Sequence, residues 1–236
     1  MSELRPELLV ATSVVNPNVQ TRLLVTGSEP LTMGIEQKRL VYATVLGRSA
    51  LQADNVGPSI TIVERTFAVT KVTNVSDRFV NNWLACNQAG IPVPPTMRRV
   101  DKNRLLITDV KADGSETYGK AMTFSFGSAP EDERCRAHTN IDPLFMDVTS
   151  DMGPLEAKLD HYVARATTAG IKLANDDPFE LVVRPDGTWD FMALDLVGVI
   201  PNSRNTQQKI GDHNQLSATM LMNDLSAIRT GFRFKQ

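Results

Sequence analysis

The chain has few of the features that mark several large classes of protein. Its 236 residues include only two cysteines, Cys86 and Cys135, which lie far apart and form no Cys-x-x-Cys motif. This usage is typical of a reducing compartment with unpaired thiols, although a single disulfide between the two stays open. The formal net charge is −2. No overall electrostatic attraction to nucleic acid or to an acidic membrane surface is therefore expected.

Long apolar runs are also missing. No segment approaches the roughly 18 consecutive apolar residues of a membrane-spanning helix. The opening MSELRPELLV lacks the basic-then-apolar pattern of a secretion signal. We therefore expect a cytoplasmic protein without a membrane partner. The histidines show no metal-ligand spacing, and the sequence contains no Walker loop, Rossmann fingerprint or Gly-x-Ser-x-Gly motif.

What remains is an ordinary globular composition, with 42% hydrophobic and 22% charged residues and no internal repeat. The length allows one larger domain or two small lobes, with enough chain to bury a core. Apolar stretches separated by polar breaks predict three strands in succession, at residues 40–46, 60–63 and 67–72. A tight turn at residues 64–66 would join the last two in an antiparallel meander.

Helical spacing first occurs after Ser76, a candidate N-cap, where apolar residues recur at intervals of three or four up to Gly90. The prolines that follow force an extended passage. Beyond that passage the pattern predicts strands at residues 96–100 and 104–110 and helices at residues 155–170 and 214–230.

The most informative stretch is residues 170–200, GIKLANDDPFELVVRPDGTWDFMALDLVGVI. Two apolar runs flank a Pro-Asp-Gly turn. Because Pro presets one turn angle and Gly tolerates positive φ, the pattern predicts a β-hairpin. A hairpin brings its outer ends together, so an acid cluster suited to a divalent cation and a phosphate group is expected there. A solvated loop is the alternative explanation for the same acids. They are Asp176, Asp177, Glu180 and Asp195.

The order of these elements resembles that of a protein-kinase-like fold. AGIPVP at residues 89–94 is similar to the helix-to-strand passage of the aminoglycoside-phosphotransferase-like branch of that superfamily. RLLITDV at residues 104–110 resembles the strand that leads into the family's nucleotide-contacting hinge. The likeness covers residues 60–199 in pattern. It implies an α+β, protein-kinase-like two-lobe fold, with a β-rich N-terminal lobe at residues 1–110 and a reduced C-terminal lobe at residues 111–236.

The resemblance also implies a nucleotide site. Lys71 would hold the α- and β-phosphates of ATP, while Asp109 and Val110 would lie at the nucleotide-contacting hinge. The sequence departs from the family here. No glycine-rich loop precedes Lys71, and no glutamate stands between Asp77 and Gly90 to pair with it.

The metal and acceptor sites are implied by the hairpin acids. Glu180 and Asp195 would bind Mg²⁺, and Asp176 or Asp177 would orient the acceptor hydroxyl. The family's catalytic aspartate is replaced by Asn175, which cannot act as a carboxylate base, and no glycine follows Asp195. One of the two neighbouring aspartates would have to substitute for the missing base.

Three functions follow from these observations. The first is a divergent ATP-dependent phosphotransferase that acts on a small molecule or a protein. The second is a catalytically inactive, pseudokinase-like binding protein that engages a protein partner, such as a phage- or virus-type accessory factor. The third is a structural α+β protein whose likeness to the family is fortuitous. No nucleic-acid partner is indicated.

Overall fold

The computed structural model describes residues 7–32, 36–46, 56–67, 75–119, 142–174, 178–194 and 196–229. The chain divides into two compact units. One unit comprises Met1–Leu84 and Pro94–Ala112, and the other comprises Ala85–Val93 and Asp113–Gln236.

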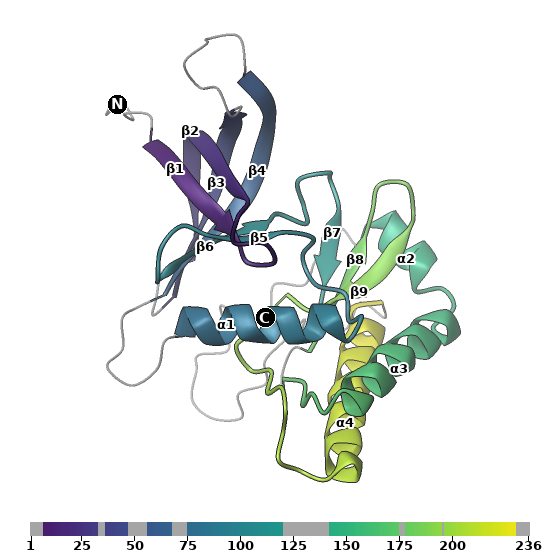
Figure 1. Cartoon of the computed structure of the whole chain (residues 1–236). Coiled ribbons are helices and arrows are strands. Elements are labelled where there is room, and N and C mark those ends of the chain that lie inside the picture. Colours follow the sequence, from purple (N-terminus) through teal and green to yellow (C-terminus); the bar gives the residue numbers. More distant parts are fainter. Residues whose placement is uncertain are drawn as a thin grey trace, which may run out of the picture. The chain divides into compact units, whose positions relative to one another are not determined.

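The described residues form nine strands and four helices (Figure 1). All strand pairing in both units is antiparallel. The elements are β1 (Glu7–Ser13), β2 (Gln20–Thr32), β3 (Glu36–Leu46), β4 (Val56–Phe67), α1 (Val75–Gln88), β5 (Met97–Arg99), β6 (Arg104–Thr108), β7 (Glu116–Tyr118), α2 (Pro143–Val148), α3 (Gly153–Thr168), β8 (Glu180–Val183), β9 (Trp189–Met192) and α4 (Gln207–Arg229).

The first unit is a closed barrel with strand order β1-β2-β3-β4-β6-β5. Closure comes from the pairing of β1 with β5, in which Thr12 lies opposite Arg99. Because side chains alternate along a strand, each barrel strand has one face inside and one outside. On β1, Leu9 and Ala11 are buried whereas Leu8 and Val10 are exposed.

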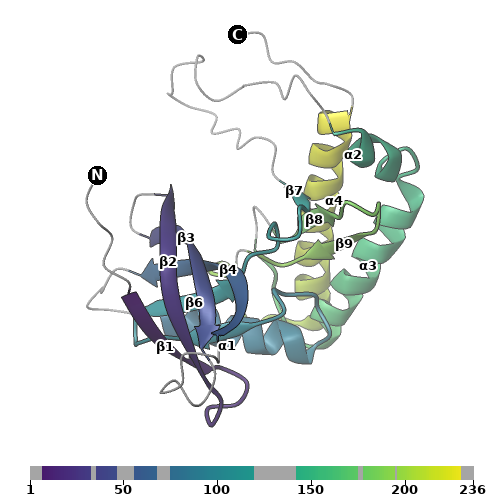
Figure 2. The ribbon, with the colours of Figure 1, turned by 90° about the horizontal axis from the view of Figure 1, so that it is seen from above.

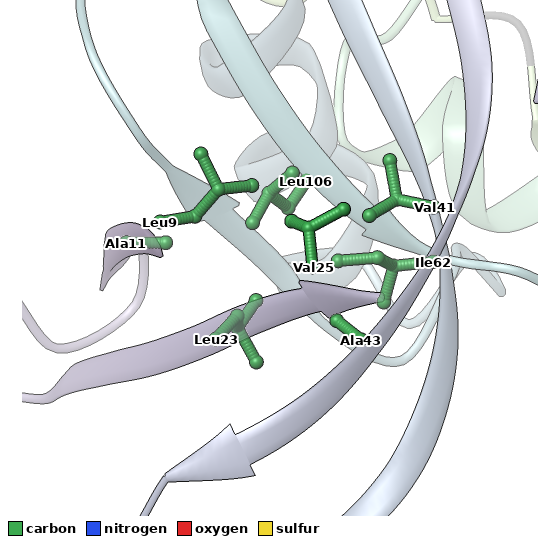
Figure 3. Close-up of a cluster of buried hydrophobic side chains, with 8 residues drawn as sticks. All are labelled: Leu9, Ala11, Leu23, Val25, Val41, Ala43, Ile62 and Leu106. Atoms are coloured by element: carbon green, nitrogen blue, oxygen red, sulfur yellow. The ribbon is translucent and has the colours of Figure 1, made fainter. Parts of the chain in front are cut away.

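The inside of the barrel is filled by apolar side chains from five strands, which point toward one another in Figure 3. Burying each of the larger ones contributes about 1.5–3 kcal/mol relative to leaving it exposed. This cluster occupies the barrel interior and is the core of the first unit. It consists of Leu9, Ala11, Leu23, Val25, Val41, Ala43, Ile62 and Leu106.

The outer face of β4 carries the first part of α1. The ring centroids of Phe67 and Phe79 lie 5.7 Å apart, and the guanidinium of Arg65 lies 4.3 Å from the centre of the Phe79 ring. Trp83 is buried and its indole Nε1 donates to the carbonyl of Pro94 at 3.1 Å. The apolar stripe that predicted this helix is therefore the face that packs on the barrel.

The second unit is built on a three-stranded sheet in the order β7-β8-β9. Three successive residues of β8, Leu181 to Val183, are buried, so both faces of this central strand are covered. The ring centroid of Tyr162 on α3 lies 6.0 Å from that of Phe179, just before β8. Helices α3 and α4 pack against each other (Figure 2).

This architecture overturns the predicted protein-kinase-like two-lobe fold. The first unit closes into a six-stranded barrel. Only four helices occur in the described part of the chain, which therefore does not contain the helical C-terminal lobe of that fold. The reason for the error is physical. Barrel closure depends on pairing between β1 and β5, which lie far apart in the sequence, and local periodicity carries no information about distant partners.

The predicted turn at residues 64–66 is also wrong, because β4 continues through it to Phe67. Charged residues within an apolar run suggested a break in the strand. Glu64 instead points into the barrel, where Arg39 and Arg104 bind it, and Arg65 packs against aromatic rings. None of the helices in the described part of the chain combines the length and apolar character needed to cross a membrane.

Candidate functional site

The predicted hairpin of residues 170–200 forms, and its closed end is a tight turn. The amide of Arg184 donates to the carbonyl of Thr188 at 2.8 Å, and Gly187 has φ of +80°. Asp186 accepts from the Thr188 amide at 2.9 Å and from its hydroxyl at 2.7 Å. These hydrogen bonds lower the pKa of Asp186. The Pro-Asp-Gly signal therefore predicted the turn correctly.

The two arms of the hairpin are held together a second time, far from the turn. In the β8–β9 ladder Glu180 lies opposite Met192. An isolated bridge pairs Lys172 with Ile200, through backbone hydrogen bonds of 2.8 and 2.9 Å. This bridge lies equally far along both arms from the Glu180–Met192 pair, so it continues the same register. Each arm between the bridge and the ladder therefore has the same number of residues.

Close packing also joins the arms near the bridge. A Cβ placed on Gly198 would lie 2.8 Å from the Cβ of Ala174, closer than two carbons can approach without displacement. Only glycine allows the two backbones this approach.

Helix α4 fixes the arm that precedes residue 175. Asn214 is fully buried. Its Oδ1 accepts from the Leu173 amide at 2.9 Å, and its Nδ2 donates to the Ile171 carbonyl at 2.9 Å and to Thr167 Oγ1 at 3.2 Å. Nε2 of His213 lies 3.0 Å from the Leu173 carbonyl, which can only accept a hydrogen bond. These contacts bind α4 to the arm through both backbone groups and side chains.

The arm that follows β9 is fixed as well. The amide of Ala193 donates to the carbonyl of Pro92 at 2.8 Å. Within β9, Asp190 accepts from the Tyr162 hydroxyl at 2.9 Å and pairs with the Lys158 ammonium at 3.1 Å. Burial, and to a smaller extent the hydrogen bond to Asp190, raises the pKa of Tyr162 to about 12, so this phenol stays protonated at neutral pH.

The predicted acids belong to these two arms. Glu180 is the first residue of β8 and is half-buried. Its Cγ lies 3.0 Å from the position that a Cβ on Gly119 would take. Asp176 and Asp177 of one arm and Asp195 of the other lie outside the described residues. The structure thus places the flanks of all three aspartates but only one of the four predicted acids.

The predicted nucleotide residues are divided between described and undescribed parts of the chain. Lys71 lies outside the described residues. Asp109 and Val110 follow β6 in the first unit and are both half-buried. Asp109 Oδ1 accepts from the Lys111 amide at 3.0 Å, and the Asp109 carbonyl accepts from the Ala112 amide at 3.3 Å. In the structure Asp109 therefore stabilises a turn.

Within the described ranges, no group of three or more histidine, cysteine, aspartate or glutamate side chains is arranged to hold a metal ion. Sequence reasoning missed a different cluster, formed inside the barrel by Glu7, Arg39, Glu64 and Arg104. The sequence did contain a signal for this cluster. These residues lie two positions from buried apolar residues on alternating strands, so they share the inward face.

No protein-family model matches the chain, and a search of curated proteins finds no match. Its function must therefore be argued from its own chemistry. The hairpin arms that carry the acids and the polar groups inside the barrel are the two features that offer such chemistry.

Proposed function

We propose that the protein is an ATP-dependent phosphotransferase whose Mg²⁺ site is formed by acids on the two arms of the 172–200 hairpin. One observation supports this most. The arms share a register at both ends, through Lys172 with Ile200 and through Glu180 with Met192. The segments between these pairs carry Asp176 and Asp177 on one arm and Asp195 on the other.

This arrangement suits phosphoryl transfer. Mg²⁺ prefers carboxylate oxygens together with substrate phosphates as ligands. The reaction needs mainly positioning of the transferred group and neutralisation of its developing charge, so a few well-held acids and a cation are sufficient. The buried Asn214 and the Ala193–Pro92 hydrogen bond hold the arms, which lowers the cost of ordering a metal site between them.

Each residue has a proposed role. Glu180 and Asp195 bind Mg²⁺, and Asp176 or Asp177 orients the acceptor hydroxyl of a small molecule or a protein. The proposed donor is ATP, and the proposed location of the reaction is the cytoplasm.

Thermal unfolding with and without millimolar Mg-ATP tests the proposal. A ligand at about 100 times its Kd stabilises the folded state by about 2.7 kcal/mol, which raises Tm by roughly 5–10 °C for a chain of this size. We expect this shift in the wild type and its loss in Asp195→Asn. Asp186→Asn is the matched control, because Asp186 lies at the closed end of the same hairpin and the amide keeps an oxygen for Thr188. A shift of equal size in all three proteins would exclude the hairpin site.

A second candidate, a binding protein without catalysis, is favoured by the outer face of β1. Leu8 is 57% exposed and Val10 is 42% exposed on that face, an apolar surface that a protein partner would cover. Release of ADP separates the two functions. ADP formation with a candidate acceptor, lost in Asp195→Asn, supports the phosphotransferase. Absence of any shift with Mg-ATP or Mg-GTP would instead support the binding protein.

A further inference from the structure

Arg98 lies in the barrel wall with its side chain turned inward. It is part of β5, opposite Ser13 of β1 and Leu106 of β6. Leu106 belongs to the core and points into the barrel in Figure 3. Because residues that face each other across a strand pair project on the same side of the sheet, the side chain of Arg98 also projects into the barrel.

Two threonine hydroxyls hold the guanidinium of Arg98 in place. Nε donates to Thr21 Oγ1 at 3.1 Å, and Nη1 donates to Thr96 Oγ1 at 3.1 Å. Thr21 lies opposite the core residue Ala11, so its side chain points inward as well. Thr96 Oγ1 is fixed in turn by Thr108 Oγ1 at 2.7 Å. The neighbours of the guanidinium are therefore neutral hydroxyl groups.

The other arginines inside the barrel have their charge balanced. Arg39 and Arg104 each pair with both Glu7 and Glu64, so two positive and two negative charges cancel. Glu7 is the first residue of β1, whereas the residue opposite Arg98 is the last, so the two sets of groups lie at opposite ends of that strand. In the part of the chain that the structure describes, Arg98 has no carboxylate partner. The end of the barrel that holds Arg98 therefore carries an uncompensated positive charge.

Part of the Arg98 guanidinium is free and can be reached from solvent. Among the described residues, Nη2 makes no hydrogen bond and Nη1 uses one of its two N–H groups. Every fully buried side-chain nitrogen and oxygen of those residues has a partner, so Nη2, which has none, retains access to solvent. The Thr21 hydroxyl accepts from Arg98 and donates to no described group, so its own hydrogen is available too.

These donors suit an oxyanion. A guanidinium binds phosphate or carboxylate through two parallel N–H···O bonds, which are stronger than hydrogen bonds between neutral groups. The free N–H groups of Nη1 and Nη2 offer such a pair, and the Thr21 hydroxyl offers a third donor. A phosphate group has enough oxygens for all three, whereas a carboxylate has only two. The donor set therefore favours phosphate.

We propose that Arg98 binds the phosphate group of a small ligand at this end of the barrel. Nη1 and Nη2 bind two of its oxygens, and the Thr21 hydroxyl binds a third. The hydroxyls of Thr21 and Thr96 hold the guanidinium in its orientation before the ligand arrives, which reduces the cost of binding. All three residues belong to the first unit, and the site needs neither Mg²⁺ nor the acids of the hairpin.

An NMR titration of the full chain with inorganic phosphate, in the absence of Mg²⁺, tests the site. The readout is the signal of the Arg98 Nε–H group, which its hydrogen bond to Thr21 protects and which Arg98→Lys identifies by removing it. We expect a saturable shift of this signal, and none with sodium chloride at the same ionic strength. Asp195→Asn should show the same phosphate titration as the wild type, so failure of the hairpin site does not affect the result.

Two variants separate binding from a purely structural role of Arg98. Arg98→Lys keeps the charge but loses the planar fork, so phosphate binding, followed through the Thr21 amide signal, should weaken about tenfold. Thr21→Val keeps Arg98 and the shape of the side chain but removes the hydroxyl, and it should weaken binding roughly fivefold. Arg22→Gln is the matched control, because Arg22 is the exposed neighbour of Thr21 on the outer face of β2. It should bind phosphate as the wild type does.

Three results would overturn the proposal. The first is the absence of a saturable shift in the wild type, or an equal shift with chloride. The second is unchanged phosphate affinity in both Arg98→Lys and Thr21→Val. The third is an equal loss of affinity in Arg22→Gln and Arg98→Lys, because binding would then depend on surface charge alone.

Discussion

Charged residues inside the barrel explain why the predicted turn in β4 is wrong, and they form a cluster of salt bridges there. Glu64 interrupts an apolar run, which suggested a turn, yet the residue is buried within β4 and bound by Arg39 and Arg104. A carboxylate in a strand is a turn signal only when water solvates it. Here two guanidinium groups replace the water, and they come from strands whose pairing the local sequence does not specify.

The pH dependence of stability provides a test of this cluster, through Glu7. Burial alone would raise its pKa, but hydrogen bonds and charge attraction from Arg39 and Arg104 outweigh burial and lower it below the ordinary value of 4.5. A lowered pKa in the folded state stabilises the protein above about pH 4.5, and this contribution is lost as pH falls through the folded-state value. The difference in unfolding free energy between wild type and Glu7→Gln should therefore be largest at neutral pH and shrink below pH 4.5. Urea titrations at pH 7 and pH 3 measure it. An equal difference in unfolding free energy at pH 7 and pH 3 would show that folding does not lower the pKa of Glu7.

At the scale of elements, the sequence predicted what local chemistry determines. The Pro-Asp-Gly hairpin and the helix near residue 155 were confirmed as β8–β9 and α3. The last helix was expected from residue 214, yet α4 begins at Gln207. The prediction missed the first two turns because they are polar and show no apolar period. Ser76, the expected N-cap, lies within α1 and donates instead to the Lys102 carbonyl.

The candidate sites also differ in how far local sequence chemistry could predict them. Local turn chemistry was enough to predict that the two acid-bearing arms meet, because a hairpin pairs neighbouring segments. The site at Arg98 was not predicted, since it needs the pairing of β5 with β1 and with β6, which turns this arginine inward. Both pairings depend on register between strands, which the pattern of a single strand does not specify.

The close approach of the hairpin arms gives a prediction at this scale. Gly198→Ala puts a methyl group 2.8 Å from the Cβ of Ala174, so the arms must separate, at a cost of about 1–3 kcal/mol. Gly211→Ala is the matched change within α4, where the new Cβ lies 3.4 Å from Thr167 Cγ2. It should be neutral or stabilise by up to about 1 kcal/mol, because alanine favours the helix. Chemical unfolding of both variants measures the contrast. Equal effects of the two substitutions would show that the arms are not tightly packed.

Whole-molecule architecture was the least predictable level. Strands were expected in the regions of β3, β4, β5 and β6, yet these strands join β1 and β2 in a closed barrel instead of forming the lobe of a two-lobe kinase-like fold. Closure requires β1 to pair with β5, and three strands and α1 lie between these two strands in the sequence. A local pattern of strands is compatible with an open sheet or a closed barrel, so sequence periodicity alone does not distinguish them.

The division into two units gives the last prediction, because the boundary falls inside α1. Trp83 is buried in the first unit, and Cys86, one turn later, is buried in the second. A helix of 14 residues is marginal without packing. Unfolding either unit removes the packing of one end of α1, so the two units should unfold together.

Trp189→Phe makes this coupling measurable, since the chain has two tryptophans and Trp83 then reports alone on the first unit. Circular dichroism at 222 nm reports mainly on α3 and α4, the longest helices of the second unit. We expect both signals to give the same midpoint in a urea titration, as a cooperative transition requires. The wild type controls for the effect of the substitution on stability. Two separated midpoints would show that the shared helix does not couple the units, and that each folds on its own.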